Sequence, residues 1–156
     1  MSRPVQVGVI SDTHGLVRPE VLGALAGVDL IVHAGDVGSP DVLRRLGTLA
    51  PVRAVRGNND HGAWAEGLPV TDVVEVGEAA LYVLHDLHAL DLDPAAARFD
   101  VVIAGHSHRP RAERRGEVLY VNPGSAGPRR FRLPVALVRL CIRGRQVRSE
   151  LVDLLP

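Results

Sequence analysis

The segment VQVGVISDTH, residues 5–14, joins an apolar run directly to two side chains that can bind a metal ion. Residues 5–10 are mostly β-branched and apolar, which predicts a first strand buried on both faces of a sheet. Asp12 and His14 follow at the end of this strand. In extended backbone, residues two apart point to the same side, so both side chains can reach one ion or two neighbouring ions.

Two more units of the same kind follow in the first third of the chain. Apolar runs at 29–33 and 52–55 predict a second and a third strand. Short helices are predicted over 19–25, with Pro19 in the first turn, and from Pro40 to about Leu49, with Ser39 as the N-cap. Three strand–loop–helix units in a row predict a mostly parallel α/β sheet.

The rest of the chain has a different character. Residues 72–76 and 80–84 predict a hairpin that turns at Gly77-Glu78. Further strands are predicted at 101–104, 118–121, 135–141 and 146–153, with a helical turn at 94–98. We therefore expect residues 1–156 to form one α/β domain with two sheets, each covered by helices.

Composition excludes several classes of function. The formal net charge is zero, so nothing favours strong attraction to nucleic acid or to an anionic membrane. The single cysteine, Cys141, cannot form an internal disulfide, and its apolar surroundings predict a small buried residue. No secretory signal or membrane-spanning run is visible. A cytoplasmic enzyme without a membrane partner is the expectation.

Seven side chains with metal-binding groups lie at or just after the ends of predicted strands. They are two carboxylates, one amide and four imidazoles: Asp12, His14, Asp36, Asn58, His85, His106 and His108. In open α/β sheets functional groups gather at the carboxyl ends of the strands, so we expect these side chains to converge. Seven ligands are enough for two ions, and paired ions hydrolyse phosphate esters.

Glycines precede three of these candidate ligands, at Gly35, Gly57 and Gly105. A glycine lets the backbone approach a bound group closely, although for any one of them alone an ordinary turn residue is the preferred interpretation.

These segments together resemble the calcineurin-like metallophosphoesterase superfamily. The motifs that carry the resemblance are Asp12-Thr13-His14, Gly35-Asp36, Gly57-Asn58-Asn59-Asp60, a strand-end His85 and Gly105-His106-Ser107-His108. The short length and the segment Asn122-Pro123-Gly124-Ser125 make the chain similar to the small bacterial and archaeal phosphodiesterases of the YfcE type. The resemblance extends from about Val5 to Cys141.

The resemblance implies a four-layer αββα sandwich in which two mixed β-sheets are flanked by helices. It also implies a division of ligands, with Asp12, His14 and His108 on one ion, Asn58, His85 and His106 on the other, and Asp36 bridging both. The implied reaction is in-line attack on phosphorus by a hydroxide that bridges the ions. Mixed nitrogen and oxygen ligands suit transition metals, with Mn²⁺ preferred and Fe, Zn²⁺ or Ni²⁺ possible.

The chain departs from the family pattern at Asn59, where many relatives have a histidine that is thought to protonate the leaving group. Asn59 and Asp60 occupy the positions of that catalytic pair. His88 is a further catalytic candidate that could partly replace the lost acid, and a surface histidine is an equally good reading of it. His33 is expected to be a core histidine or to support a ligand.

The leading hypothesis is thus a dinuclear phosphodiesterase that acts on a small phosphate ester. A non-catalytic scaffold of the same fold and a mononuclear metal-binding protein are the alternatives. A nuclease is disfavoured because the chain lacks a basic groove. A homo-oligomer could form through an exposed strand or through Trp64.

Overall fold

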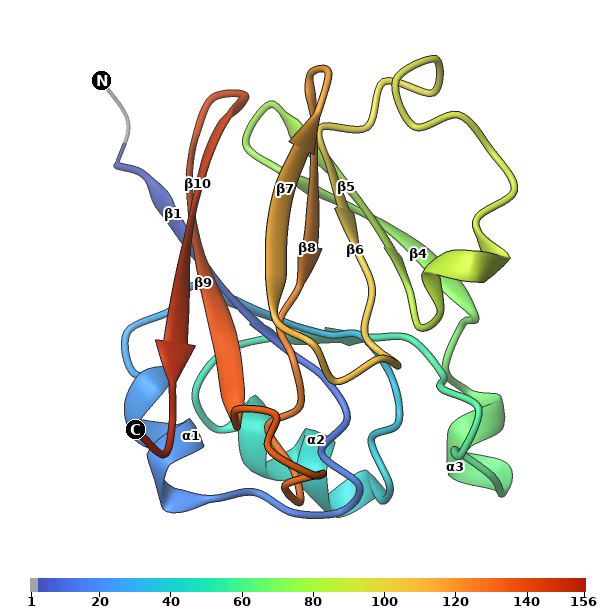
Figure 1. The fold of residues 1–156 in the computed structure, drawn as a ribbon, viewed down its shortest axis with the longest axis vertical. Coiled ribbons are helices and arrows are strands. Elements are labelled where there is room, and N and C mark those ends of the chain that lie inside the picture. Colours follow the sequence, from blue (N-terminus) through green and yellow to red (C-terminus); the bar gives the residue numbers. More distant parts are fainter. Residues whose placement is uncertain (1–2) are drawn as a thin grey trace.

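Two five-stranded mixed sheets form the fold of the computed structural model, which describes residues 3–156 (Figure 1). The first sheet has the order β10-β9-β1-β2-β3. Its strands are β1 (Val5–Ile10), β2 (Leu30–His33), β3 (Val52–Ala54), β9 (Ala136–Arg143) and β10 (Gln146–Asp153). Strands β1, β2 and β3 are parallel, and β9 and β10 join them as an antiparallel hairpin.

The second sheet has the order β4-β5-β6-β8-β7. Its strands are β4 (Thr71–Val76), β5 (Ala79–Leu84), β6 (Val101–Ile103), β7 (Arg111–Arg115) and β8 (Val118–Asn122). Strands β5, β6 and β8 are parallel, whereas β4 and β7 are antiparallel edge strands. The predicted hairpin at 77–78 joins β4 and β5.

The main core lies between the sheets. Alternate residues of the facing strands, such as Val7 and Val9 of β1 and Leu81 and Val83 of β5, pack together there. Successive residues of a strand point to opposite faces, so every second residue faces this core. With few aromatic residues in the chain, mainly valine and leucine fill these inward positions.

Helices α1 (Pro19–Ala24) and α2 (Pro40–Gly47) cover the outer face of the first sheet. Both begin at the predicted prolines. Ser39 occupies the N-cap position of α2 with extended backbone, but its side chain makes no capping hydrogen bond. The Ser39-Pro40 sequence therefore predicted where α2 begins, but the expected capping hydrogen bond from Ser39 does not form.

The outer face of the second sheet has a thin cover. The segment 87–99 packs Leu87, Leu90 and Phe99 on it and contains only one short 3-10 helix, η1 (Leu87–Ala89). The two mixed sheets of the predicted α/β sandwich are confirmed, and the fourth layer consists mainly of this irregular segment and the turn at 94–98. Asp93 caps this turn by accepting the backbone N–H of Ala95, and Arg98, with a φ of 64°, ends it after one turn.

Two elements lie where the sequence predicted none. Strand β7 has the sequence RAERR, which is too highly charged to be predicted as a strand. It is an edge strand that pairs with β8. Helix α3 (Ala63–Glu66) carries Trp64, which is half-buried against the cluster under α1 and α2. None of the helices in residues 3–156 has the length and apolar character that crossing a lipid bilayer requires.

Candidate metal centre

The loops after β1, β2, β5 and β6 meet at one edge of the two sheets and bring most of the candidate ligands together. Five of these residues have positive φ: Asp12, His14, Asp36, His106 and His108. Non-glycine residues rarely adopt this conformation, and such strained positions cluster at functional sites. The backbone is therefore shaped to aim these side chains inward.

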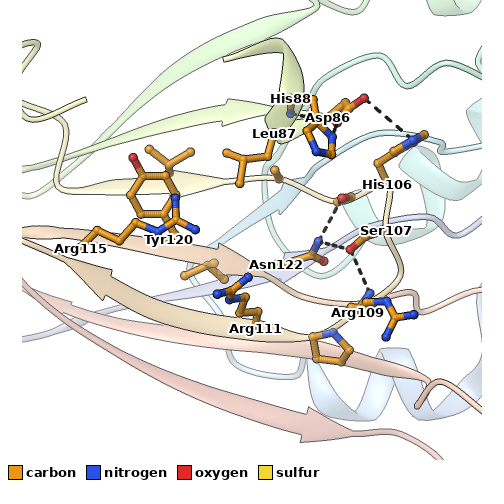
Figure 2. Close-up of a pocket in the computed structure, with 15 residues that line it drawn as sticks. Asp86, Leu87, His88, His106, Ser107, Arg109, Arg111, Arg115, Tyr120 and Asn122 are labelled. Atoms are coloured by element: carbon orange, nitrogen blue, oxygen red, sulfur yellow. Dashed lines mark hydrogen bonds and ion pairs between the residues drawn. The ribbon is translucent and has the colours of Figure 1, made fainter. Parts of the chain in front are cut away.

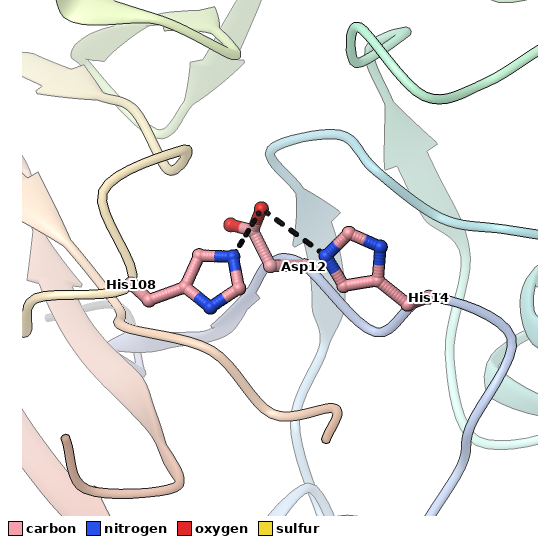
Figure 3. Close-up of side chains that lie close together, drawn as sticks. All are labelled: Asp12, His14 and His108. Carbon is pink, nitrogen blue, oxygen red and sulfur yellow. Dashed lines mark ion pairs between the residues drawn. The ribbon is translucent and has the colours of Figure 1, made fainter. Parts of the chain in front are cut away.

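One group of potential ligands consists of Asp12, His14 and His108 (Figure 3). Asp12 is fully buried, and its Oδ1 atom lies 3.8 Å from His14 Nε2 and 3.2 Å from His108 Nε2. A second group consists of Asp12, Asp36 and His85. Asp12 is thus common to both groups.

Asp36 lies between an imidazole of each group. Its Oδ2 atom is 3.3 Å from His85 Nε2 and 4.0 Å from His14 Nε2. These contacts match the position that a bridging carboxylate needs. Because Asp12 Oδ1 is also 3.9 Å from His85 Nε2, both carboxylates lie within reach of both groups.

Buried atoms without hydrogen bonds show that the pocket fits a cation. Asp12 Oδ1 and His14 Nε2 are both buried, and neither has a hydrogen-bond partner in residues 3–156. Leaving a buried polar atom without a partner costs about 1–3 kcal/mol of folding free energy, and a charged carboxylate costs more. Divalent ions accept such oxygen and nitrogen donors, so the residues present suit metal ligation.

His85 is oriented as a metal ligand. Its Nδ1 atom lies 2.8 Å from the carbonyl oxygen of Ala34, which can only accept, so Nδ1 carries the proton. The lone pair of Nε2 then faces Asp36. Burial would lower the pKa of His85, but the neighbouring Asp36 carboxylate and the Ala34 carbonyl outweigh it and raise that pKa.

The two carboxylates are held in the ionised form. Burial would raise the pKa of Asp36, but the close contact with His85 and the hydrogen bond from the Asn59 backbone keep it well below its usual range. Burial would also raise the pKa of Asp12, but contacts with His108 and Ser11 outweigh it, so this pKa is lowered too. Ionised carboxylates surrounded by imidazole nitrogen atoms form an electrostatic environment that favours a cation.

Two of the seven predicted ligands lie outside these groups. His106 has a side chain 45% exposed, with Nδ1 3.3 Å from His85 Nε2 and Nε2 3.9 Å from Asp86 Oδ2. Asn58 is exposed at the end of the loop that follows β3. His106 borders the cluster through its contact with His85, and ligation by either residue stays a prediction.

The three predicted catalytic residues have different surroundings. Asn59 binds Asp36 twice, through its backbone N–H to Oδ1 at 2.9 Å and its Nδ2 to Oδ2 at 3.1 Å. Asp60 is buried and accepts backbone N–H groups of Val37, Gly38 and Gly57, so it ties two site loops together.

His88 lies apart from both metal groups. Its side chain is 97% exposed, and its Nδ1 atom lies 3.2 Å from Asp86 Oδ1. It contacts the candidate site only through Asp86, which faces His106. A catalytic role for His88 remains a prediction.

Glycines permit the close approach of the loops, as the sequence predicted. A Cβ atom at Gly57 would lie 2.2 Å from Asp36 Oδ1, and one at Gly105 would lie 2.1 Å from Ser11 Oγ and 2.6 Å from Asp12 Oδ2. Both glycines therefore support the candidate ligands by having no side chain.

His33 is a fully buried histidine that links two site loops. The backbone N–H of Gly35 donates to its Nδ1, so Nε2 carries the proton and donates to Thr13 Oγ1 at 3.0 Å. Thr13 in turn donates to the Val37 carbonyl. Burial lowers the pKa of His33 to about 4, which keeps the ring neutral and confirms the prediction of a core or supporting histidine.

This neutral His33 predicts a pH dependence of stability. Between the unfolded pKa of 6.5 and the folded pKa of about 4, the unfolded chain binds a proton that the folded chain does not. Stability therefore falls as the pH drops through this window, by about 1.6 kcal/mol from pH 6.5 to 5. Urea denaturation with a chelator present should show a smaller pH slope for His33→Gln than for wild type. Equal slopes would contradict the assignment.

Several residues that support the ligands were not among the predicted site residues. Ser11 Oγ donates to Asp12 Oδ2 at 2.6 Å, and Ser125 Oγ donates to the Asp12 carbonyl at 2.9 Å. The Asn122-Pro123-Gly124-Ser125 segment thus reaches the site, as the resemblance suggested. Asp86 was missed because nothing in its local sequence distinguishes it from a surface carboxylate.

Comparisons with known proteins agree with this geometry. The model of the calcineurin-like phosphoesterase superfamily domain matches residues 5–144. A protein of Methanothermobacter thermautotrophicus named probable metallophosphoesterase is 37% identical in an alignment of 161 positions that covers 94% of this chain and 91% of that protein. Phosphodiesterase YfcE of Escherichia coli is 34% identical over 139 residues, covering 74% of this chain and 76% of its own length.

A solved structure shows the same fold. Vacuolar protein sorting 29 from Cryptosporidium parvum has a TM-score of 0.83 at 20% identity, covering 97% of this chain and 92% of that one. The match over residues 5–144 and the two relatives above confirm the resemblance drawn from the motifs. The chain belongs to the calcineurin-like phosphoesterase superfamily.

Proposed function

We propose that this protein is a dinuclear metal-dependent phosphodiesterase that hydrolyses a small phosphate diester. The observation that carries the proposal is the position of Asp36 Oδ2 between His85 and His14, beside the unpartnered Asp12 Oδ1. The phosphodiesterase name of the YfcE relative supports the diester as substrate.

The residues divide into two sets of ligands. Asp12, His14 and His108 would hold one ion, and His85 would hold the other, completed by Asn58 and His106 from the rim. Asp36 would bridge the two ions, and Asp12 also lies within reach of both groups. Two divalent ions held there would supply Lewis acidity to a phosphate and a bound water acidic enough to be a nucleophile near neutral pH. Mn²⁺ is the preferred ion, with Fe, Zn²⁺ or Ni²⁺ as alternatives.

A reconstitution experiment tests this function. Metal-stripped protein is supplied with Mn²⁺, Ni²⁺, Zn²⁺ or Mg²⁺ in turn and assayed on bis(p-nitrophenyl) phosphate and on p-nitrophenyl phosphate. We expect no turnover without metal, restoration by transition ions and preference for the diester. A non-catalytic scaffold would show no metal-dependent hydrolysis, and a mononuclear protein would bind one ion per chain.

Asn59 gives this proposal a specific consequence. Its amide has no group that donates a proton usefully near neutral pH, and it is already bound to Asp36. General acid catalysis contributes about 10²–10⁴ in rate, so turnover should be weak on esters with poor leaving groups.

We expect Asn59→His to increase activity on alkyl phosphate esters more than on aryl esters. The measurement is the ratio of kcat/KM for methyl p-nitrophenyl phosphate and for an alkyl diester. The control is His61→Asn, an exchange of the same two residue types at an exposed position of the same loop. Asn59→His would also break the Nδ2 contact with Asp36, so the ratio between substrates, and not the absolute rate, carries the result. An unchanged ratio would rule out a missing acid at this position.

A further inference from the structure

A groove of about 680 Å³ lies beside the candidate metal centre on the outer face of the second sheet (Figure 2). His106 and Asp86 form its end nearest the metal centre, where His106 Nδ1 is 3.3 Å from His85 Nε2. At its other end are Arg115 and Tyr120, from β7 and β8. A molecule that binds at the metal centre can therefore extend directly into this groove.

The thin fourth layer leaves this groove open. Strands β6 and β8 present Val102, Ala104 and Tyr120 to it, and the segment 87–99 covers only part of the same face. A regular helix across the face would fill this space. The groove is thus a local property of this chain's irregular segment.

The groove carries guanidinium groups on one wall. Arg109, Arg111 and Arg115 line it, whereas Asp86 is the single carboxylate in its lining. Arg111 and Arg115 lie on the same side of β7 and both pair with Glu113 Oε2, at 2.5 and 3.4 Å. Counting Glu113 with the lining residues leaves one positive charge in excess, which favours an anionic occupant.

Most other polar groups of the groove are already bound. Asn122 Nδ2 donates to Ser107 Oγ and to the Gly105 carbonyl, and Ser107 Oγ also accepts the Arg109 backbone N–H. These groups fix the loop shape, so the groups that remain to recognise a ligand are the arginine side chains, two of which share the single carboxylate of Glu113. Arg115 also lies over the Tyr120 ring, 4.4 Å from its centre, which holds the guanidinium against an apolar surface.

We propose that this groove binds one ester arm of the substrate, and that the preferred substrate is a phosphodiester whose arm carries a second phosphate group beyond an apolar spacer. This inference rests on the proposed diesterase function. The scissile phosphate occupies the metal centre, the spacer packs along Leu87 and Tyr120, and the second phosphate meets Arg111 and Arg115. Guanidinium groups recognise phosphate through paired, charge-assisted hydrogen bonds.

The test uses two substrates that differ only in the second phosphate. They are the p-nitrophenyl ester of thymidine 5′-phosphate and the same ester with an added 3′-phosphate. We expect wild type to prefer the bisphosphate substrate by about tenfold in kcat/KM, mostly through KM, since one charge-assisted contact is worth roughly this factor. The preference should vanish in Arg111→Ala/Arg115→Ala and persist in Arg148→Ala, an exposed arginine on β10 of the other sheet.

Calorimetry separates this inference from the proposed function. Metal-free wild type should bind thymidine 3′,5′-bisphosphate more tightly than thymidine 5′-phosphate, and the double variant should bind both equally. If the protein hydrolyses bis(p-nitrophenyl) phosphate but shows no preference between the two thymidine substrates, the proposed role of the groove is wrong and the proposed diesterase function stands. Selective binding without hydrolysis of any diester overturns the diesterase and supports the groove as an anion site. Thermal melting confirms that the double variant is folded.

Discussion

Asp36→Asn should fold and lose nearly all phosphodiesterase activity. Asp36 Oδ2 lies between His85 and His14, one imidazole from each ligand group, so its charge acts on both proposed ions. Lewis acid stabilisation by a metal is worth several kcal/mol, so removing the bridging charge should lower kcat/KM by about 10³-fold or more. The measurement is kcat/KM on bis(p-nitrophenyl) phosphate together with metal content per chain.

The asparagine replacement also perturbs a local contact. One of its side-chain atoms becomes an NH₂ group that faces a donor of Asn59, so one hydrogen bond is lost and about 1–3 kcal/mol of stability with it. Asp100→Asn is the matched control, since Asp100 also accepts a backbone N–H, from Ala80, and pairs with Arg145 at the far end of the second sheet. Full activity in Asp36→Asn with two bound ions would refute the bridging assignment.

The strand pattern of the fold was predictable because hydrophobic period and turn residues act locally. Residues 5–10 and the hairpin at 77–78 were placed correctly because their apolar runs end at glycine or polar residues. Residues 146–153 were placed correctly because the turn at Gly144 follows an apolar strand and returns the chain beside it. Strand β7 escaped prediction because pairing with β8, and not its own composition, makes RAERR a strand. Edge strands tolerate charge on both faces, so sequence periodicity is weakest there.

The convergence of the candidate ligands was also predictable, since the carboxyl ends of parallel strands share one edge. Asp12, His14, Asp36, His85 and His108 lie together, as expected. What the sequence could not reveal is how these residues are held. Ser11 and Ser125 support Asp12 through hydrogen bonds that depend on the shape of the loops. The groove beside His106 exists because segment 87–99 covers only part of the outer face of the second sheet.

Asp12→Asn should remove both bound ions from an otherwise folded protein. Asp12 Oδ2 accepts hydrogen bonds from Ser11 Oγ at 2.6 Å and from the His106 backbone N–H at 3.1 Å. The asparagine carbonyl can accept both bonds, which leaves its NH₂ group in the place of Oδ1. That group cannot bind a cation, and Oδ1 is the atom that both ligand groups share. His14→Ala, by contrast, should remove ligands from one group only.

The two variants are distinguished by metal content and by the stabilisation that metal provides. Binding at about 100 times Kd stabilises a folded protein by about 2.7 kcal/mol, which raises Tm by roughly 5–10 °C in a domain of this size. We expect saturating Mn²⁺ to raise the Tm of wild type, to raise that of His14→Ala less, and to leave Asp12→Asn unchanged. Asp41→Asn serves as the control for loss of one carboxylate, since Asp41 forms an exposed ion pair with Arg44. If Asp12→Asn retained one tightly bound ion, Asp12 would serve a single ion, and Asp36 alone would join the two groups.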